Sequence, residues 1–247
     1  MLRSGNPALS TKTFQEISSS SSEGVMTLEG AVNKSAISLL ILLICGAWTY
    51  TMPITEAATY IWPGFIGGFI VALVTIFKKK WSGVTVPIYA VLEGLALGGI
   101  SKVYADLFYE GIVTQSILLT VCIFGTLLLA YKSKLIKPTE NFKLGVTAAT
   151  GGIFFFYIIS FVFSIFSGAH PPLLDPSNGG IVSIGFSLFV VVIASLNLVM
   201  DFDFIEEGAA QGAPKYMEWY GAFGLLVTLI WLYLEILRLL AKLNSRR

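Results

Sequence analysis

Three carboxylates lie in or beside long apolar runs, where an ionisable side chain is costly. Glu93 lies in the middle of "VPIYAVLEGLALGGIS", Asp201 follows the apolar "SLNLVM", and Glu235 lies in "LIWLYLEILRLLAKL". A charged residue at the centre of a membrane helix costs about 2.5–3.5 kcal/mol on insertion scales, so each of these needs a reason. Two carboxylates close together at low dielectric cannot both ionise easily, and such a pair can share a proton. A pair of this kind would sense pH and would also hold a cation.

Each carboxylate also has a purely structural explanation. Gly94 and Gly98 follow Glu93 with the G-x-x-x-G spacing that lets a neighbouring helix approach closely, so Glu93 would lie on a packing face. Glu235 precedes Arg238 by three residues, which is the spacing of an ion pair on one helix face. The functional hypothesis is that Glu235 faces inward and meets Asp201. If these two carboxyls are far apart, Glu93 is the next candidate partner for Asp201.

Three further acidic residues follow Asp201 in "DFDFIEEGAAQG", namely Asp203, Glu206 and Glu207. They are typical of a solvated helix end, where they would form an acidic rim beyond the apolar run. A cluster of this sign would also raise the local concentration of cations at an opening.

The residues needed for enzymatic or metal chemistry are scarce. His170 is the single histidine, so the sequence predicts neither a histidine-based metal site nor a Ser-His-Asp triad. Cys45 and Cys122 both lie in apolar runs without metal-ligand spacing. The sequence therefore predicts a protein that is not an enzyme and has no cofactor or bound metal, apart from a transported ion such as Ca²⁺.

Composition places these residues in a membrane protein. Of the 247 residues, 55% are hydrophobic and 13% are charged, whereas soluble domains have about 25% charged residues. The mean hydropathy is +0.78. Several apolar runs reach the about 20 residues that a membrane span requires. Because backbone polar groups in lipid must be satisfied within a helix, the sequence predicts an all-α integral membrane protein. The net charge of +1 gives no indication of nucleic-acid binding.

Seven apolar segments are separated by short polar loops, at residues 36–53, 61–77, 84–103, 112–131, 145–167, 180–201 and 219–241. The loops are too short for a second domain, so residues 34–247 are predicted to form one seven-helix membrane domain. Residues 1–33 are polar and include the run "SSSSS", which is typical of a mostly disordered tail.

The distribution of basic residues predicts the orientation of the spans. Lysines fill the loops after the second, fourth and sixth segments: Lys78, Lys79, Lys80, Lys132, Lys134, Lys137, Lys143 and Lys215. The loops on the opposite side are mainly acidic, with Glu56, Asp106, Glu110 and Asp175. The N-terminal tail is therefore predicted to be cytoplasmic. Seven spans would then place the C-terminus outside. The basic residues at the C-terminal end disagree with that placement and favour a cytoplasmic C-terminus: Arg238, Lys242, Arg246 and Arg247.

Three stretches together resemble the Bax inhibitor / YccA-like family of membrane proteins: "YAVLEGLALGGIS", "LNLVMDFDFIEEG" and "WLYLEILRLLAKL". The N-terminal "RSGNPALSTKTF" and "MTLEGAVNKSAISLLILL" resemble its bacterial branch. The resemblance covers essentially the whole chain. It implies a seven-helix bundle with the last helix central, and a pH-sensitive calcium leak in which aspartates of the sixth and seventh helices share a hydrogen bond.

Carried over residue by residue, the resemblance matches Asp201 to the sixth-helix aspartate and Glu93 to the third-helix glutamate of the "EGL" motif. Glu235 takes the seventh-helix position, as a glutamate. The second segment lacks the arginine with which some relatives hold the acidic pair, and Asp201 and Glu235 are further apart in sequence than in the better-known relatives. Glu235 lies about 15 to 19 residues into its helix, which is more than about 20 Å at 1.5 Å per residue. The two carboxyls would meet only if the sixth helix continues well beyond Asp201, toward Ala210.

These features support two hypotheses of different classes. The first is a calcium or other cation leak in the bacterial inner membrane, gated by protonation of Asp201 and Glu235. The alternative is a membrane regulator that binds other membrane proteins, such as a quality-control protease or a cell-death factor. The long polar tail favours the alternative, because a conduit has little use for it.

Overall fold

The computed structural model describes residues 24–168 and 171–246 of the chain. In these residues, seven helices are long and apolar enough to cross a membrane. Their main helices are α2 (Leu28–Tyr50), α4 (Ile61–Phe77), α5 (Ser82–Leu107), α6 (Ile112–Lys132), α7 (Glu140–Ser167), α8 (Ile181–Ala210) and α9 (Met217–Ser245). The second and third spans, Ile54–Phe77 and Lys79–Leu107, also include short helices. Three short helices precede α4 and α5, namely α3 (Ile54–Ala57), η2 (Ala58–Tyr60) and η3 (Lys79–Trp81). The predicted all-α fold with seven spans is confirmed.

Two helices extend beyond the apolar runs that predicted them. The helix α8 continues past Asp201 to Ala210. The helix α2 begins at Leu28, so the predicted boundary of the polar tail at residue 33 lies inside a helix. This start is set by Thr27, whose hydroxyl accepts a hydrogen bond from the Gly30 N–H (3.0 Å) and so caps the first turn. The predicted disorder of residues 1–23 and the loop position of His170 lie outside the described residues.

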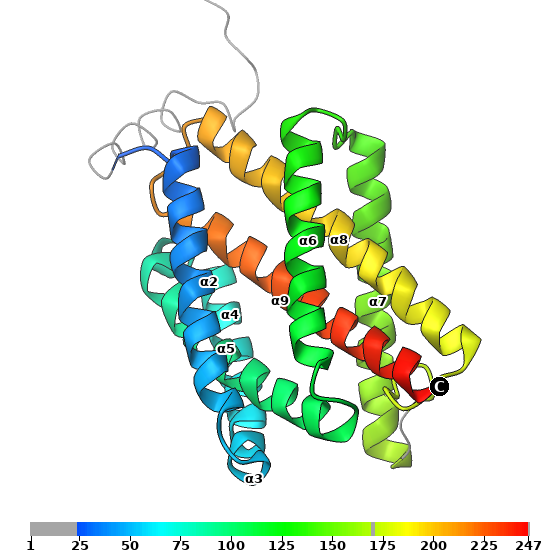
Figure 1. Cartoon of the computed structure of the whole chain (residues 1–247). Helices are drawn as coiled ribbons and strands as arrows, with labels where there is room; N and C mark the ends of the chain where they lie inside the picture. Colours follow the sequence, from blue (N-terminus) through cyan, green and yellow to red (C-terminus); the bar gives the residue numbers. More distant parts are fainter. Residues whose placement is uncertain (1–23, 169–170, 247) are drawn as a thin grey trace, which may run out of the picture.

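The last helix lies at the centre of the bundle. It packs against α2, α5, α6 and α8, and it crosses the middle of the molecule behind α6 (Figure 1, orange to red). One buried cluster joins α9 to α2 and α5 around Tyr89, Leu97 and Leu226. Another joins α9 to α8 around Leu198 and Leu232. The helices α4 and α7 are peripheral, because α4 packs mainly against α5 and α7 against α8.

Glycines allow the backbones of α2 and α5 to approach closely. A Cβ added at Gly94 would lie 2.6 Å from the carbonyl oxygen of Leu42, and one at Gly98 would overlap the carbonyl oxygen of Gly46. The G-x-x-x-G spacing therefore serves packing, as its sequence pattern indicates. On the α4 side of α5, a Cβ at Gly68 would overlap the carboxyl group of Glu93. Glu93 thus points from α5 toward α4, into space that a glycine leaves open.

Replacing Gly98 by alanine is expected to destabilise the bundle, because the new methyl group meets backbone that cannot rotate away. The cost should fall in the range of overpacked cores, about 1–3 kcal/mol. Gly125 of α6 is the matched control, since a Cβ there meets nothing within 4 Å. Thermal unfolding in detergent should show a lower midpoint for Gly98→Ala and an unchanged or higher one for Gly125→Ala. Equal midpoints for the two variants would contradict the close approach of α2 and α5.

Candidate cation site

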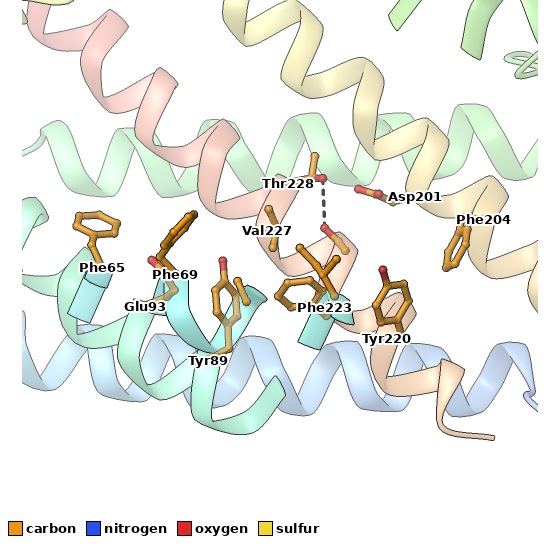
Figure 2. A pocket seen from close by; sticks show the side chains of 13 residues that line it. Phe65, Phe69, Tyr89, Glu93, Asp201, Phe204, Tyr220, Phe223, Val227 and Thr228 are labelled. Carbon is orange, nitrogen blue, oxygen red and sulfur yellow. Dashed lines mark hydrogen bonds between the residues drawn. The ribbon is translucent and has the colours of Figure 1, made fainter. Parts of the chain in front are cut away.

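A cavity of about 720 Å³ lies among α4, α5, α8 and α9. It is lined by the side chains shown in Figure 2, which come from all four helices. Two of these side chains are carboxylates, Glu93 from α5 and Asp201 from α8. The remaining lining is mostly aromatic and aliphatic. The structure therefore brings two of the three predicted site residues into one cavity.

Glu93 is buried at the α5 wall of this cavity. The residue is 6% exposed, and its Oε2 is buried without a hydrogen-bond partner in the described part of the chain. Gly68 of α4 makes room for the carboxyl group. A buried polar group without a partner is destabilising, so a hydrogen-bond donor or a cation beside this oxygen would be stabilising.

Asp201 reaches the cavity from α8 and faces α9. Its Oδ1 would lie 3.6 Å from a Cβ placed on Gly224, and Thr228 lines the cavity beside it (Figure 2). The Thr228 hydroxyl donates its hydrogen bond to the Gly224 carbonyl oxygen (3.2 Å). The Oδ2 of Asp201 is buried and has no partner among the described residues. Asp201 and Glu93 thus share the same condition on opposite walls.

Glu235 lies elsewhere, in a separate network between α7 and α9. Arg238 donates to both of its oxygens (2.8 and 3.1 Å), and the Tyr157 hydroxyl donates to Oε1 (2.6 Å). Arg238 also donates to the Tyr157 oxygen (3.1 Å). Glu235 is 2% exposed and the Arg238 side chain is 24% exposed, so a buried carboxylate is paired with a partly buried guanidinium, and the Tyr157 hydroxyl is a third hydrogen-bonding group. The structure therefore shows Glu235 in the i,i+3 ion pair with Arg238 that its spacing in the sequence indicates.

The hypothesised pair of Asp201 and Glu235 is therefore not formed. The extension of α8 to Ala210 does place Asp201 within the bundle, as the pairing required. However, Asp201 meets α9 at Gly224 and Thr228, and Glu235 lies seven residues beyond Thr228 on the same helix. Seven residues correspond to about 10 Å along a helix axis. The carboxyls are at different depths, and Glu93 instead shares a cavity with Asp201.

The three acidic residues after Asp201 differ from one another in their contacts. Asp203 forms an ion pair with Lys143 of α7 (2.7 Å), and Glu206 accepts a hydrogen bond from the Tyr131 hydroxyl of α6 (2.6 Å). Glu207 is exposed and bonds to Gln211 (2.8 Å). The acidic rim is thus partly tied to α6 and α7, which explains why α8 stays helical beyond its apolar run.

A buried lysine fixes the opposite end of α9. Lys242 is 0% exposed. Its ammonium donates to the carbonyl oxygens of Leu173 (2.6 Å) and Ser183 (3.2 Å) and to the Ser187 hydroxyl (2.8 Å). Lys242 and Arg238 are therefore both bonded within the bundle.

Glu218 is a buried carboxylate that the sequence analysis did not single out. It lies at the start of α9, is 1% exposed, and accepts hydrogen bonds from the backbone N–H and the hydroxyl of Thr27 (3.0 Å each). Lys215 is 3.6 Å away. The pattern at Thr27 indicates a helix start, but the two residues are 191 positions apart, and no local signal connects them. Glu218 fastens the beginning of α2 to α9.

Replacing Glu218 by alanine is expected to lower the free energy of unfolding by about 1–3 kcal/mol, because the Thr27 N–H loses its acceptor. Glu218→Gln keeps an acceptor oxygen and should retain most of the stability. Thermal unfolding of both variants in detergent tests this contact. If Glu218→Gln destabilises as much as Glu218→Ala, the charge of Glu218 rather than its hydrogen bonds to Thr27 carries the effect.

Comparison with known proteins bears on nearly the whole chain. Residues 6–245 match the family described as Bax inhibitor 1 like. No curated protein matches the chain in sequence. The match includes all seven membrane helices and both carboxylates of the cavity. The chain belongs to the Bax inhibitor 1-like family of membrane proteins.

Proposed function

We propose that this protein is a pH-sensitive cation leak, with calcium as the conducted ion, and that Glu93 and Asp201 are its acidic residues. The observation that carries the proposal is a cavity lined by two carboxylates, each with one buried oxygen that has no hydrogen-bond partner in the described part of the chain. Ionisable residues inside membrane bundles are rare and commonly mark ion pathways. Family membership is consistent with this activity.

The chemistry of the two carboxylates supports a dependence on pH. When ionised, they attract a cation into a low-dielectric region that is otherwise hostile to charge. When protonated, they lose this attraction. Flux should therefore rise as pH rises and the carboxylates ionise. Calcium prefers six to eight oxygen ligands, and no group of three or more acidic, histidine or cysteine residues that could hold a metal occurs in the described residues. The proposed ion therefore passes partly hydrated, without a tight binding site.

The direction of the bundle follows from its charges. The ends of α4, α6 and α8 and the beginning of α9 lie toward one face, where the loop lysines gather. By the positive-inside rule this face is cytoplasmic. The proposal places the protein in a bacterial inner membrane with its N-terminus in the cytoplasm. The cavity then lies closer to the cytoplasmic side, because its α9 lining comes from the first half of that helix.

The test is calcium entry into proteoliposomes that contain the full chain and a calcium-sensitive dye, followed between about pH 6 and pH 8. Flux should increase with pH in the unmodified protein, and Asp201→Asn should be slow at every pH. Protein-free vesicles and Glu110→Gln, an exposed loop residue, are the controls. Flux that is independent of pH and unchanged in Asp201→Asn would contradict the proposal.

A further inference from the structure

The lining of the cavity is unusual for a site that would meet only inorganic ions. Six aromatic side chains contribute to it: Phe65, Phe69, Tyr89, Phe204, Tyr220 and Phe223. Aromatic faces attract organic ammonium groups through cation–π contacts, and they also bury apolar carbon. The volume of about 720 Å³ falls within the range of small-molecule sites, about 300–1,000 Å³. The cavity therefore has room and walls for an organic molecule.

The polar groups of the cavity define the head of such a molecule. Glu93 is only 6% exposed, and its Oε2 has no hydrogen-bond partner among the residues that the structure describes. The Oδ2 atom of Asp201 is a second buried oxygen without a partner within residues 24–168 and 171–246. Ionised carboxylates only accept hydrogen bonds, so the missing partner must donate them. A protonated amine supplies both the positive charge and the N–H donors, whereas an anion or a neutral hydrocarbon supplies neither.

The position of the cavity indicates how the molecule would enter. Its α4 and α8 edges are apolar and exposed, with Phe69 63%, Ile76 45% and Phe204 45% accessible. All three residues lie on membrane-spanning helices. The exposed apolar border formed by α4 and α8 therefore offers an opening to the cavity. A lipophilic amine that partitions into the bilayer would reach the carboxylates through this opening.

One contact within the chain already shows an ammonium group against this lining. The Nζ of Lys79 lies over the ring of Tyr220, 5.2 Å from its centroid. Lys79 is exposed and belongs to η3, just before α5. The aromatic wall is therefore accessible to a positive charge at its lysine-rich end.

We propose that the cavity binds lipophilic organic amines, with the ammonium group attracted by the carboxylates of Glu93 and Asp201 and the apolar portion against the Phe residues of α4 and α8. The inference uses the same cavity as the proposed ion pathway, but it does not require that calcium crosses the membrane. Binding without flux would leave it intact and would contradict only the proposed function.

The probe is 2-(1-naphthyl)ethylamine, and its matched control is 2-(1-naphthyl)ethanol, which has the same shape without the charge. Binding to the full chain in nanodiscs is measured by equilibrium dialysis at neutral pH. The amine should bind saturably and at least about tenfold more tightly than the alcohol, a difference of about 1.4 kcal/mol. The same amine should bind at least about tenfold more weakly to Glu93→Gln and to Asp201→Asn.

Two controls separate this site from partitioning into lipid and from misfolding. Glu110→Gln removes an exposed carboxyl outside the cavity and should bind the amine like the unmodified protein. Phe69→Leu keeps the carboxylates but removes one aromatic wall, and it should weaken binding of the amine and of the alcohol to a similar extent, because both place the same naphthyl group against this wall. Equal binding of amine and alcohol, or equal binding by Glu93→Gln and Glu110→Gln with unchanged unfolding midpoints, would overturn the proposal.

Discussion

Replacement of Arg238 by methionine is expected to lower the free energy of unfolding by about 3–5 kcal/mol, because it leaves the buried carboxylate of Glu235 without its cation. Arg238 makes two hydrogen bonds to Glu235 and one to Tyr157. With the arginine gone, only Tyr157 would bond to Glu235. Methionine preserves much of the apolar volume, so the loss reports the charge rather than a cavity. Chemical unfolding in detergent measures it.

Two further variants test this explanation. Arg238→Met combined with Glu235→Leu removes both charges and should recover most of the lost stability, since a buried ion pair is often replaceable by apolar residues. Lys102→Met breaks a more exposed i,i+4 pair with Asp106 (3.1 Å) and should cost at most about 1 kcal/mol. A double variant as unstable as Arg238→Met would mean that the arginine acts through packing and not through Glu235.

The second large effect concerns flux. Glu93→Gln and Asp201→Asn should each slow calcium entry at high pH by at least about tenfold, which corresponds to about 1.4 kcal/mol in the barrier. The double variant should be hardly slower than the slower single variant, because both carboxylates attract a cation into the same cavity. The dependence on pH should weaken in each single variant, in which one carboxylate still ionises, and should disappear in the double variant.

The control for these single and double variants is Glu207→Gln, which removes an exposed carboxyl from the acidic rim at a residue that does not line the cavity. Its flux should keep the pH dependence of the unmodified protein. Fully multiplicative losses in the double variant would contradict a shared site and would indicate two independent steps along the pathway.

The membrane fold was predictable because it follows from segment length and hydropathy alone. The ends of α2 and α8 were less predictable, since they depend on polar contacts. Thr27 caps the start of α2 ahead of the apolar run. The ion pair of Asp203 with Lys143 depends on the packing of α7 beside α8, which the sequence of α8 alone does not show. Hydropathy treats these polar residues as loop, whereas their side-chain bonds allow the helix to continue.

The candidate site likewise has features that follow from the local sequence and features that depend on contacts between helices. Glu93 and Asp201 were recognisable as carboxylates in apolar surroundings, because their cost in a membrane is a local property. Which carboxyls share a cavity depends on the relative depth of α5, α8 and α9, and the sequence contains no direct measure of depth. The link between Tyr157 and Glu235 joins residues 78 positions apart, so the alternative partner of Glu235 was equally hidden.

The buried lysine at the end of α9 gives the helix an electrical asymmetry. The acidic cavity lies along the first half of α9, while Lys242 lies near its end, held by two carbonyl oxygens and a hydroxyl. The negative charge of Glu235 compensates the positive charge of Arg238, whereas the three groups that accept hydrogen bonds from Lys242 are neutral. A cation that leaves the cavity along α9 toward the C-terminal end therefore approaches the buried ammonium group of Lys242, and a cation moving the opposite way moves away from it. In the proposed leak, α9 would act as a rectifier, with a current that differs between the two directions at equal and opposite voltages.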